Sequence, residues 1–159
     1  MSNPRDNFVR ALDKLADKGV ETVEVSGLWQ SPSWPPGQGY PDFLNAVAKI
    51  NWSGTAYELL EILQSIEQSF GRLHSERNAP RPLDLDILDF NGQIIRSELL
   101  NLPHPRMLDR GFVLLPLQQV SPNWLDPETG KAISDYIARL PLCDIEPMKY
   151  RGVFYEIRR

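Results

Sequence analysis

Apolar positions near the start of the chain repeat first with a helical period and then with a strand period. After Asn3-Pro4, a pair typical of a helix start, apolar side chains recur every three or four residues as far as Gly19. Over residues 20–26, apolar and polar side chains alternate, as they do in a half-buried strand. This pattern predicts a helix followed by a strand.

The next stretch predicts a loop, a strand and a second helix. Residues 31–42 contain four prolines and two glycines, so they predict an irregular surface loop. Alternating positions over residues 43–52 then predict one continuous strand. Thr55 and Glu58 form a capping-box pattern, and an apolar helical stripe follows them as far as a stop at Gly71.

The second half of the chain predicts shorter elements. Residues 83–90 alternate and are followed by Asn91-Gly92, so we expect a strand and a hairpin turn that returns along residues 93–95. Two further helices and a final strand are expected at residues 113–120, 133–140 and 153–157. The order of elements predicts an α/β (α+β) sandwich with a mixed or antiparallel sheet.

The composition is that of an ordinary globular protein. Its 159 residues, 42% of them hydrophobic, favour one domain that covers residues 1–159. A single cysteine cannot form an internal disulfide, and no apolar run approaches the roughly 20 residues of a membrane helix. The N-terminus lacks the apolar core of a signal peptide, so we expect a cytoplasmic protein. A net charge of −4 argues against non-specific nucleic-acid binding.

Asp84 and Asp86 are the most informative pair in the chain. In a strand both side chains point to one face, roughly 6–7 Å apart, where they repel each other by roughly 2–3 kcal/mol at an effective dielectric constant of about 20. Two solvated carboxylates are the simpler interpretation, but Leu88 and Phe90 continue the same face and should half cover it. The pair therefore predicts a Mg²⁺ site shared with a polyphosphate.

A stretch of ten residues before this pair contains four basic side chains: Arg72, His74, Arg77 and Arg81. They could be scattered surface charges, but beside two aspartates they favour phosphate binding, because arginine pairs bidentately with phosphate oxygens. No G-x-x-x-x-G-K-[ST] motif is present, so a P-loop is not expected.

Two other groups of side chains could join this site. His104 and Arg110 form a second basic pair, although His104 by itself would also suit an ordinary turn. Asn45 next to Phe43 could read the donor and acceptor edge of a heterocycle, or it could be an ordinary sheet-edge amide.

In their order along the chain these motifs match a known family. They are Pro41-Asp42-Phe43-Leu44-Asn45-Ala46, Gln64 with Glu67, Gly71-Arg72, Pro80-Arg81-Pro82-Leu83-Asp84-Leu85-Asp86-Ile87, Pro103-His104 and Arg110-Gly111-Phe112. Together they resemble the 6-hydroxymethyl-7,8-dihydropterin pyrophosphokinase family of folate biosynthesis, from about residue 3 to residue 140. The resemblance implies a ferredoxin-like sandwich with a mostly antiparallel sheet. It also implies transfer of pyrophosphate from ATP to the pterin hydroxymethyl group, which releases AMP.

The resemblance also implies a role for individual residues. Catalysis would involve Arg72, Arg81, Asp84, Asp86 and Arg110, with two Mg²⁺ ions held by the two aspartates. ATP contacts would be Gln64, Glu67, Arg72, His74, Arg77, Arg81, Ile87, His104 and Arg110. Pterin contacts would be Ser31, Pro32, Phe43, Asn45 and Phe112. We expect a monomer that binds neither nucleic acid nor membrane.

Three features depart from the family pattern. His74 stands where a second arginine is usual, and Asn78-Ala79 replace a tryptophan-glycine pair in a loop one residue shorter. The family's first apolar strand, which ends in Gly-Ser-Asn, has no counterpart after Met1. We therefore expect an upstream start, a decayed relative, or a tail strand at 153–157 in its place. A catalytically weak homologue that binds nucleotide or pterin stays an alternative, and a ferredoxin-like RNA-binding module is a third one, disfavoured by charge.

Overall fold

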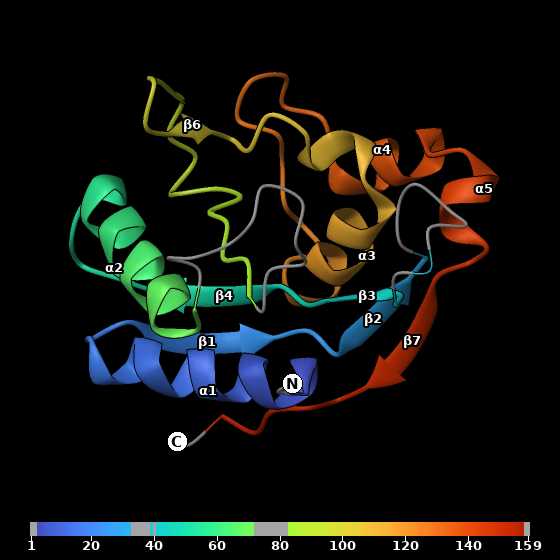
Figure 1. Ribbon diagram of the computed structural model, residues 1–159. Coiled ribbons are helices and arrows are strands. Elements are labelled where there is room, and N and C mark those ends of the chain that lie inside the picture. The colour runs from blue at the N-terminus through green and yellow to red at the C-terminus, as the bar shows by residue number, and fades with distance from the viewer. Residues whose placement is uncertain (1–2, 33–38, 40, 72–82, 158–159) are drawn as a thin grey trace.

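The computed structural model describes residues 3–32, 39, 41–71 and 83–157 (Figure 1). Within those ranges no helix combines the length and the apolar character needed to cross a membrane. The strand pairings in this part of the chain are all antiparallel, and helices flank them, so the expected α+β class is confirmed.

Two antiparallel strand pairs that meet at a bend form the centre of the fold. β1 (Glu21–Val25) pairs with β4 (Ala48–Asn51), and β2 (Leu28–Ser31) pairs with β3 (Phe43–Asn45). At the bend, Ser26 N–H donates to the Val47 carbonyl over 2.8 Å, and Val47 N–H donates to Ser26 Oγ over 2.9 Å.

This bend changes two predictions. The strand expected over residues 20–26 is confirmed as β1. The single strand expected over 43–52 is corrected to two strands, β3 and β4, because residues 46–47 lie at the bend between them. β2 was not predicted, and it begins before the loop expected at residues 31–42.

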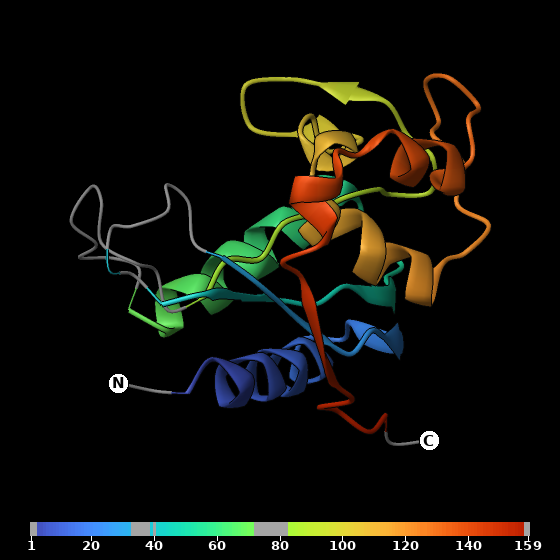
Figure 2. The ribbon, with the colours of Figure 1, turned by 90° about the vertical axis from the view of Figure 1, so that its right-hand side faces the viewer.

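The described residues form five α-helices, of which the first four lie largely where the periodicity indicated and the short fifth was not predicted. They are α1 (Pro4–Asp17), α2 (Ala56–Ser69), α3 (Gly111–Val120), α4 (Ile133–Arg139) and α5 (Leu142–Ile145). Asn3 caps α1, and Thr55 and Glu58 form the expected reciprocal capping box on α2. Figures 1 and 2 show α1 on one side of the central strands, with α3 and α4 on the other.

The last strand lies earlier than predicted. β7 (Lys149–Gly152) pairs with β2, whereas residues 153–157 form no strand, so the prediction of a tail strand there is wrong. These residues lie along α1 instead: Phe154 packs edge-on against Phe8, with ring centroids 6.0 Å apart, and Tyr155 hydroxyl donates to Asp13 over 3.1 Å. Aromatic contacts with a helix, and not a strand ladder, account for the apolar pattern of the tail.

Residues 83–90 do not form a strand, which corrects a further prediction. The turn at Asn91-Gly92 does form, with positive φ angles of 52° and 70°. The chain after it pairs forwards, however, as β5 (Ile95–Arg96) with β6 (Asn101–Leu102). Alternation in the sequence indicates an extended backbone with one buried side, and it does not identify a pairing partner.

We predict that Asp89→Asn stabilises the protein at neutral pH. Burial raises the pKa of Asp89. Gly92 N–H, which donates over 3.3 Å, and the Trp124 side chain lower it in part, and the nearby Asp126 carboxylate raises it further. The folded protein therefore binds the Asp89 proton more tightly than the unfolded chain. The resulting destabilisation is absent below the unfolded pKa and grows as the pH rises through the folded pKa.

Thermal unfolding as a function of pH tests this prediction. The gain should stay below about 1 kcal/mol, because a half-buried carboxyl is screened by solvent, and it should vanish on acidification. Asp17→Asn changes the charge equally at an exposed position and serves as the control. A gain that does not depend on pH would contradict the explanation.

Candidate active site

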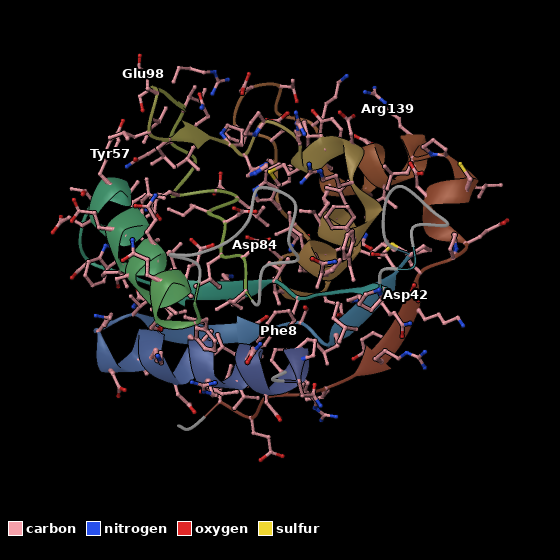
Figure 3. The ribbon with its side chains drawn as sticks, in the orientation of Figure 1. Phe8, Asp42, Tyr57, Asp84, Glu98 and Arg139 are labelled. Atoms are coloured by element: carbon pink, nitrogen blue, oxygen red, sulfur yellow. The ribbon has the colours of Figure 1, made fainter. Side chains whose placement is uncertain are left out.

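Asp84 and Asp86 both lie on the segment over residues 83–90, and both are exposed. Their exposed side chains alternate with the buried Leu83 and Ile87, and 61% of the Asp86 side chain is accessible. In Figure 3, Asp84 projects from the segment that runs between α2 and α3. Leu88 is half-buried and Phe90 is buried, as the expected cover requires, but Asp84 and Asp86 themselves are exposed, so both are accessible to a ligand. That the two carboxylates share one face stays a prediction.

Glu67 holds this segment in place from α2. Its side chain is 3% exposed, and Oε2 accepts a hydrogen bond from Leu85 N–H over 2.9 Å. Leu85 lies between the two aspartates, so the bond fixes the backbone from which both carboxylates project. Gln64, one turn earlier, is exposed. The structure thus assigns Glu67 a positioning contact, while nucleotide binding by Gln64 and Glu67 stays a prediction.

His104 reaches the same segment from the other side. The backbone N–H of His104 donates to the Leu88 carbonyl over 2.9 Å, and its ring atom Nδ1 accepts from the backbone N–H of Arg106 over 3.2 Å. The imidazole proton therefore belongs on Nε2, which lies 4.0 Å from Asp86 Oδ2. Burial lowers the pKa of His104 although Asp86 raises it, so at neutral pH the contact is not an ion pair.

Arg110 and Phe112 are brought together at the start of α3. Arg110 is the N-cap residue, and its guanidinium carbon lies 5.4 Å from the centroid of the Phe112 ring. Gly111 between them packs closely, because a Cβ there would lie 3.2 Å from Met148 Sδ and 3.3 Å from the Asp144 carbonyl oxygen. Both flanking side chains are half-buried and available for a ligand.

The predicted pterin residues share one face of the β2–β3 pair. Ser31 lies opposite Phe43, and Asn45 lies opposite Trp29, so these four side chains point to the same side. Ser31 Oγ and Asn45 Nδ2 are buried without a hydrogen-bond partner among the described residues. A buried polar atom without a partner is costly, so this face suits a ligand with polar edges. Pro32, by contrast, is exposed.

Trp29 is the residue of this face that the sequence reasoning missed. Its indole N–H donates to Gln119 Oε1 of α3 over 3.0 Å, and its ring meets Tyr150 edge-on at 5.1 Å. Gly27 makes room for this pair, since a Cβ there would lie 2.4 Å from the Tyr150 ring. The sequence Leu28-Trp29-Gln30-Ser31 does not alternate apolar with polar side chains, so periodicity gave no signal for this strand.

Several predicted contacts lie outside the described residues: Arg72, His74, Arg77 and Arg81. Their phosphate-binding roles therefore stay predictions. Ile87 is described, and its side chain is only 9% exposed within the hydrophobic core. The Ile87 side chain is therefore largely inaccessible, and its predicted contact with the nucleotide stays a prediction.

The chemistry of the described site suits Mg²⁺ only in combination with a phosphate ligand. No group of three or more potential metal-ligating side chains occurs among the described residues. Two carboxylates with accessible oxygens match the usual magnesium arrangement, in which substrate phosphates and water complete the coordination. The donor set therefore fits the predicted metal.

Comparisons with known proteins agree with this chemistry. The family model described as 7,8-dihydro-6-hydroxymethylpterin-pyrophosphokinase (HPPK) matches residues 1–122. A 2-amino-4-hydroxy-6-hydroxymethyldihydropteridine pyrophosphokinase of Synechocystis sp. is 36% identical over 144 residues, which cover 90% of this chain and 73% of that protein. The protein of the same name from Pseudomonas aeruginosa is 38% identical over 149 residues, 92% and 90% of the two chains. The folic acid synthesis protein fol1 of Pneumocystis carinii is 40% identical over 139 residues, which cover 87% of this chain and 18% of that longer protein.

We predict that Glu67→Ala destabilises the protein by about 1–3 kcal/mol, because Leu85 N–H loses its acceptor. Glu67→Gln keeps an acceptor oxygen and should cost less. Urea unfolding measures both values, and Glu61→Ala, which removes an exposed carboxylate from the same helix, is the control. Equal stability of the Glu67→Ala and Glu61→Ala variants would mean that the buried hydrogen bond does not anchor the aspartate segment.

Proposed function

This chain belongs to the 7,8-dihydro-6-hydroxymethylpterin-pyrophosphokinase family, and from that premise we propose which of its residues carry the reaction. The protein is a transferase of folate biosynthesis that moves pyrophosphate from ATP to 6-hydroxymethyl-7,8-dihydropterin. The observation that carries the residue assignment is that His104 contacts the segment that bears Asp84 and Asp86.

The transfer is an in-line displacement at phosphorus. The hydroxymethyl oxygen of the pterin attacks the β-phosphorus of ATP, and a new oxygen–phosphorus bond forms. The bond between the β-phosphorus and the α–β bridging oxygen breaks, so AMP leaves with that oxygen, and the hydroxyl proton passes to solvent. Such a transition state is stabilised mainly by positioning and by positive charge, and it needs no strong base.

Asp84 and Asp86 hold the metal in this proposal. The chemistry that bound Mg²⁺ supplies is positive charge against the phosphate oxygens. Two accessible carboxylates on the predicted common face can bind two ions, and phosphate oxygens would complete the coordination. Glu67 contributes by fixing Leu85, and therefore the spacing of the carboxylates.

His104 and Arg110 face the phosphates as hydrogen-bond donors. Nε2 of His104 lies 4.0 Å from Asp86 Oδ2, so the neutral imidazole would be able to donate its Nε2–H to a phosphate oxygen bound beside the aspartates. Arg110 at the start of α3 adds a permanent positive charge. Arg72 and Arg81 supply further charge in this proposal from outside the described residues.

The face of β2 and β3 binds the pterin. Ser31 and Asn45 offer polar atoms that lack partners, and the rings of Phe43, Trp29 and Phe112 can enclose a flat heterocycle. Polar edges and aromatic walls together select a planar ring with donors and acceptors. This complementarity supports the pterin assignment.

We further propose a single-domain monomer in the cytoplasm. One exposed cysteine, Cys143, is compatible with a reducing compartment. Light scattering after gel filtration gives the mass directly, and a dimer would contradict the monomer.

We predict that Asp84→Asn and Asp86→Asn each lower turnover more than about a hundredfold, because a lost metal contact removes several kcal/mol of transition-state stabilisation. A coupled assay for AMP with ATP, Mg²⁺ and the pterin measures it. Asp17→Asn is the charge-matched control. Calorimetry of pterin binding should change little. Binding of both ligands by the wild-type protein without AMP formation would instead establish the alternative, an inactive homologue.

We predict that Asn45→Ala raises the KM for the pterin about tenfold and changes kcat much less, since one hydrogen bond in a buried site contributes about 1.5 kcal/mol. Ser31→Ala should have a smaller effect in the same direction. Asn51→Ala removes an exposed amide from β4 and is the control. An unchanged KM in both variants would show that this face does not bind the pterin.

A further inference from the structure

The β5–β6 hairpin leads directly into His104. Each of its strands, Ile95–Arg96 and Asn101–Leu102, has two residues, and a ladder this short is marginal by itself. Only Pro103 separates Leu102 from His104. The position of His104 therefore depends on what fixes the hairpin from outside, as well as on its own backbone hydrogen bond to the Leu88 carbonyl.

Arg96 ties the hairpin to a distant loop. Its Nη1 donates to the Leu102 carbonyl over 2.8 Å and to the Ile95 carbonyl over 3.2 Å, while its Nη2 pairs with the Glu128 carboxylate. The rigid fork of a guanidinium makes these contacts at the same time, whereas the single ammonium of lysine cannot match their geometry.

Glu128 is itself anchored in the core around α3 and α4. Asp126, 2% exposed, accepts hydrogen bonds from Glu128 N–H over 2.9 Å, from Thr129 Oγ1 over 3.0 Å and from the Tyr136 hydroxyl over 2.6 Å. Burial opposes the charge of Asp126, but these hydrogen bonds outweigh it and lower its pKa, so the carboxylate stays ionised. The loop therefore presents Glu128 from a fixed base.

A second contact secures the opposite side of the hairpin. The Tyr57 hydroxyl, in the first turn of α2, bonds to Ser97 Oγ over 2.9 Å. Figure 3 shows Tyr57 and Glu98 on this side of the molecule. The hairpin is thus fastened both to α2 and, through Arg96, to the loop before α4.

We propose that Arg96 and Glu128 are positioning residues for pyrophosphate transfer: their ion pair holds the Leu102 carbonyl, and thereby directs His104 Nε2 towards Asp86. Their side chains are 51% and 41% exposed, so the pair contributes little to folding, and its effect is on geometry. This inference rests on the proposed function of His104.

Steady-state kinetics of four variants tests the proposal: Arg96→Met, Arg96→Lys, Glu128→Gln and the exchange Arg96→Glu with Glu128→Arg. Arg96→Met should lower kcat about tenfold, as a small displacement of a reacting group does, with the KM for the pterin unchanged. Arg96→Lys should recover part of the loss, and Glu128→Gln should lose less than Arg96→Met. The exchange should not recover activity, because glutamate at 96 cannot donate to the Leu102 carbonyl.

A reading that is independent of turnover comes from the imidazole resonances. The chain has two histidines, His74 and His104, so their ring signals in the NMR spectrum can be assigned with His104→Gln. At one fixed pH, Arg96→Met should shift the His104 signal and leave His74 in place. Glu98→Gln, which removes an exposed carboxylate from the same hairpin, should move neither.

Each outcome decides the question. An unmoved His104 signal, an unchanged kcat in Arg96→Met, or activity restored by the charge exchange would overturn the positioning role. Absence of turnover in the wild-type protein would instead overturn the proposed function. The resonance shift would then still report whether Arg96 orients His104.

Discussion

Asp84 and Asp86 are like charges on one segment, and the proposed site depends on contacts that fix the backbone of this segment so that both carboxylates can bind a cation. No strand ladder among the described residues does so. Two hydrogen bonds outside any strand ladder fix the segment: Glu67 accepts from Leu85 N–H, and the Leu88 carbonyl accepts from the backbone N–H of His104. The backbone is therefore fixed by contacts that also bring α2 and His104 to the aspartates.

The two halves of the site rest on different supports. The face proposed for the pterin belongs to the central strands, where the β2–β3 register places Ser31 and Asn45 on one side. The side proposed for the phosphates belongs to residues 83–110, which are positioned by side chains such as Glu67 and Arg96. A regular sheet suits a flat ligand whose outline is constant. Irregular segments held by hydrogen bonds suit a charged ligand that needs several donors from different directions.

The family assignment and the local geometry support each other without being interchangeable. Identity of 36–38% over most of two relatives establishes the family. The roles of single residues need the contacts: Glu67 matches a nucleotide-site residue by its place in the motif, yet its buried carboxylate binds the backbone of Leu85. Ile87 likewise matches an ATP contact, while its side chain lies in the core. Both differences arise because a motif preserves residue order, whereas the fold decides which atoms each side chain contacts.

The sequence by itself determined the elements whose signals are local. Asn3-Pro4 and the Thr55–Glu58 capping box set the starts of α1 and α2, and the spacing of Asp84 and Asp86 predicts that both carboxylates share one face. Only the tertiary structure decided the rest. The split of residues 43–52 into β3 and β4 and the contacts of Trp29 with Gln119 and Tyr150 depend on partners far along the chain. The pairing of β5 with β6 is local, but the hairpin is fixed by the distant Glu128 and Tyr57. Periodicity reports which side of a segment is buried, and the identity of the residue it meets is settled only when the chain folds.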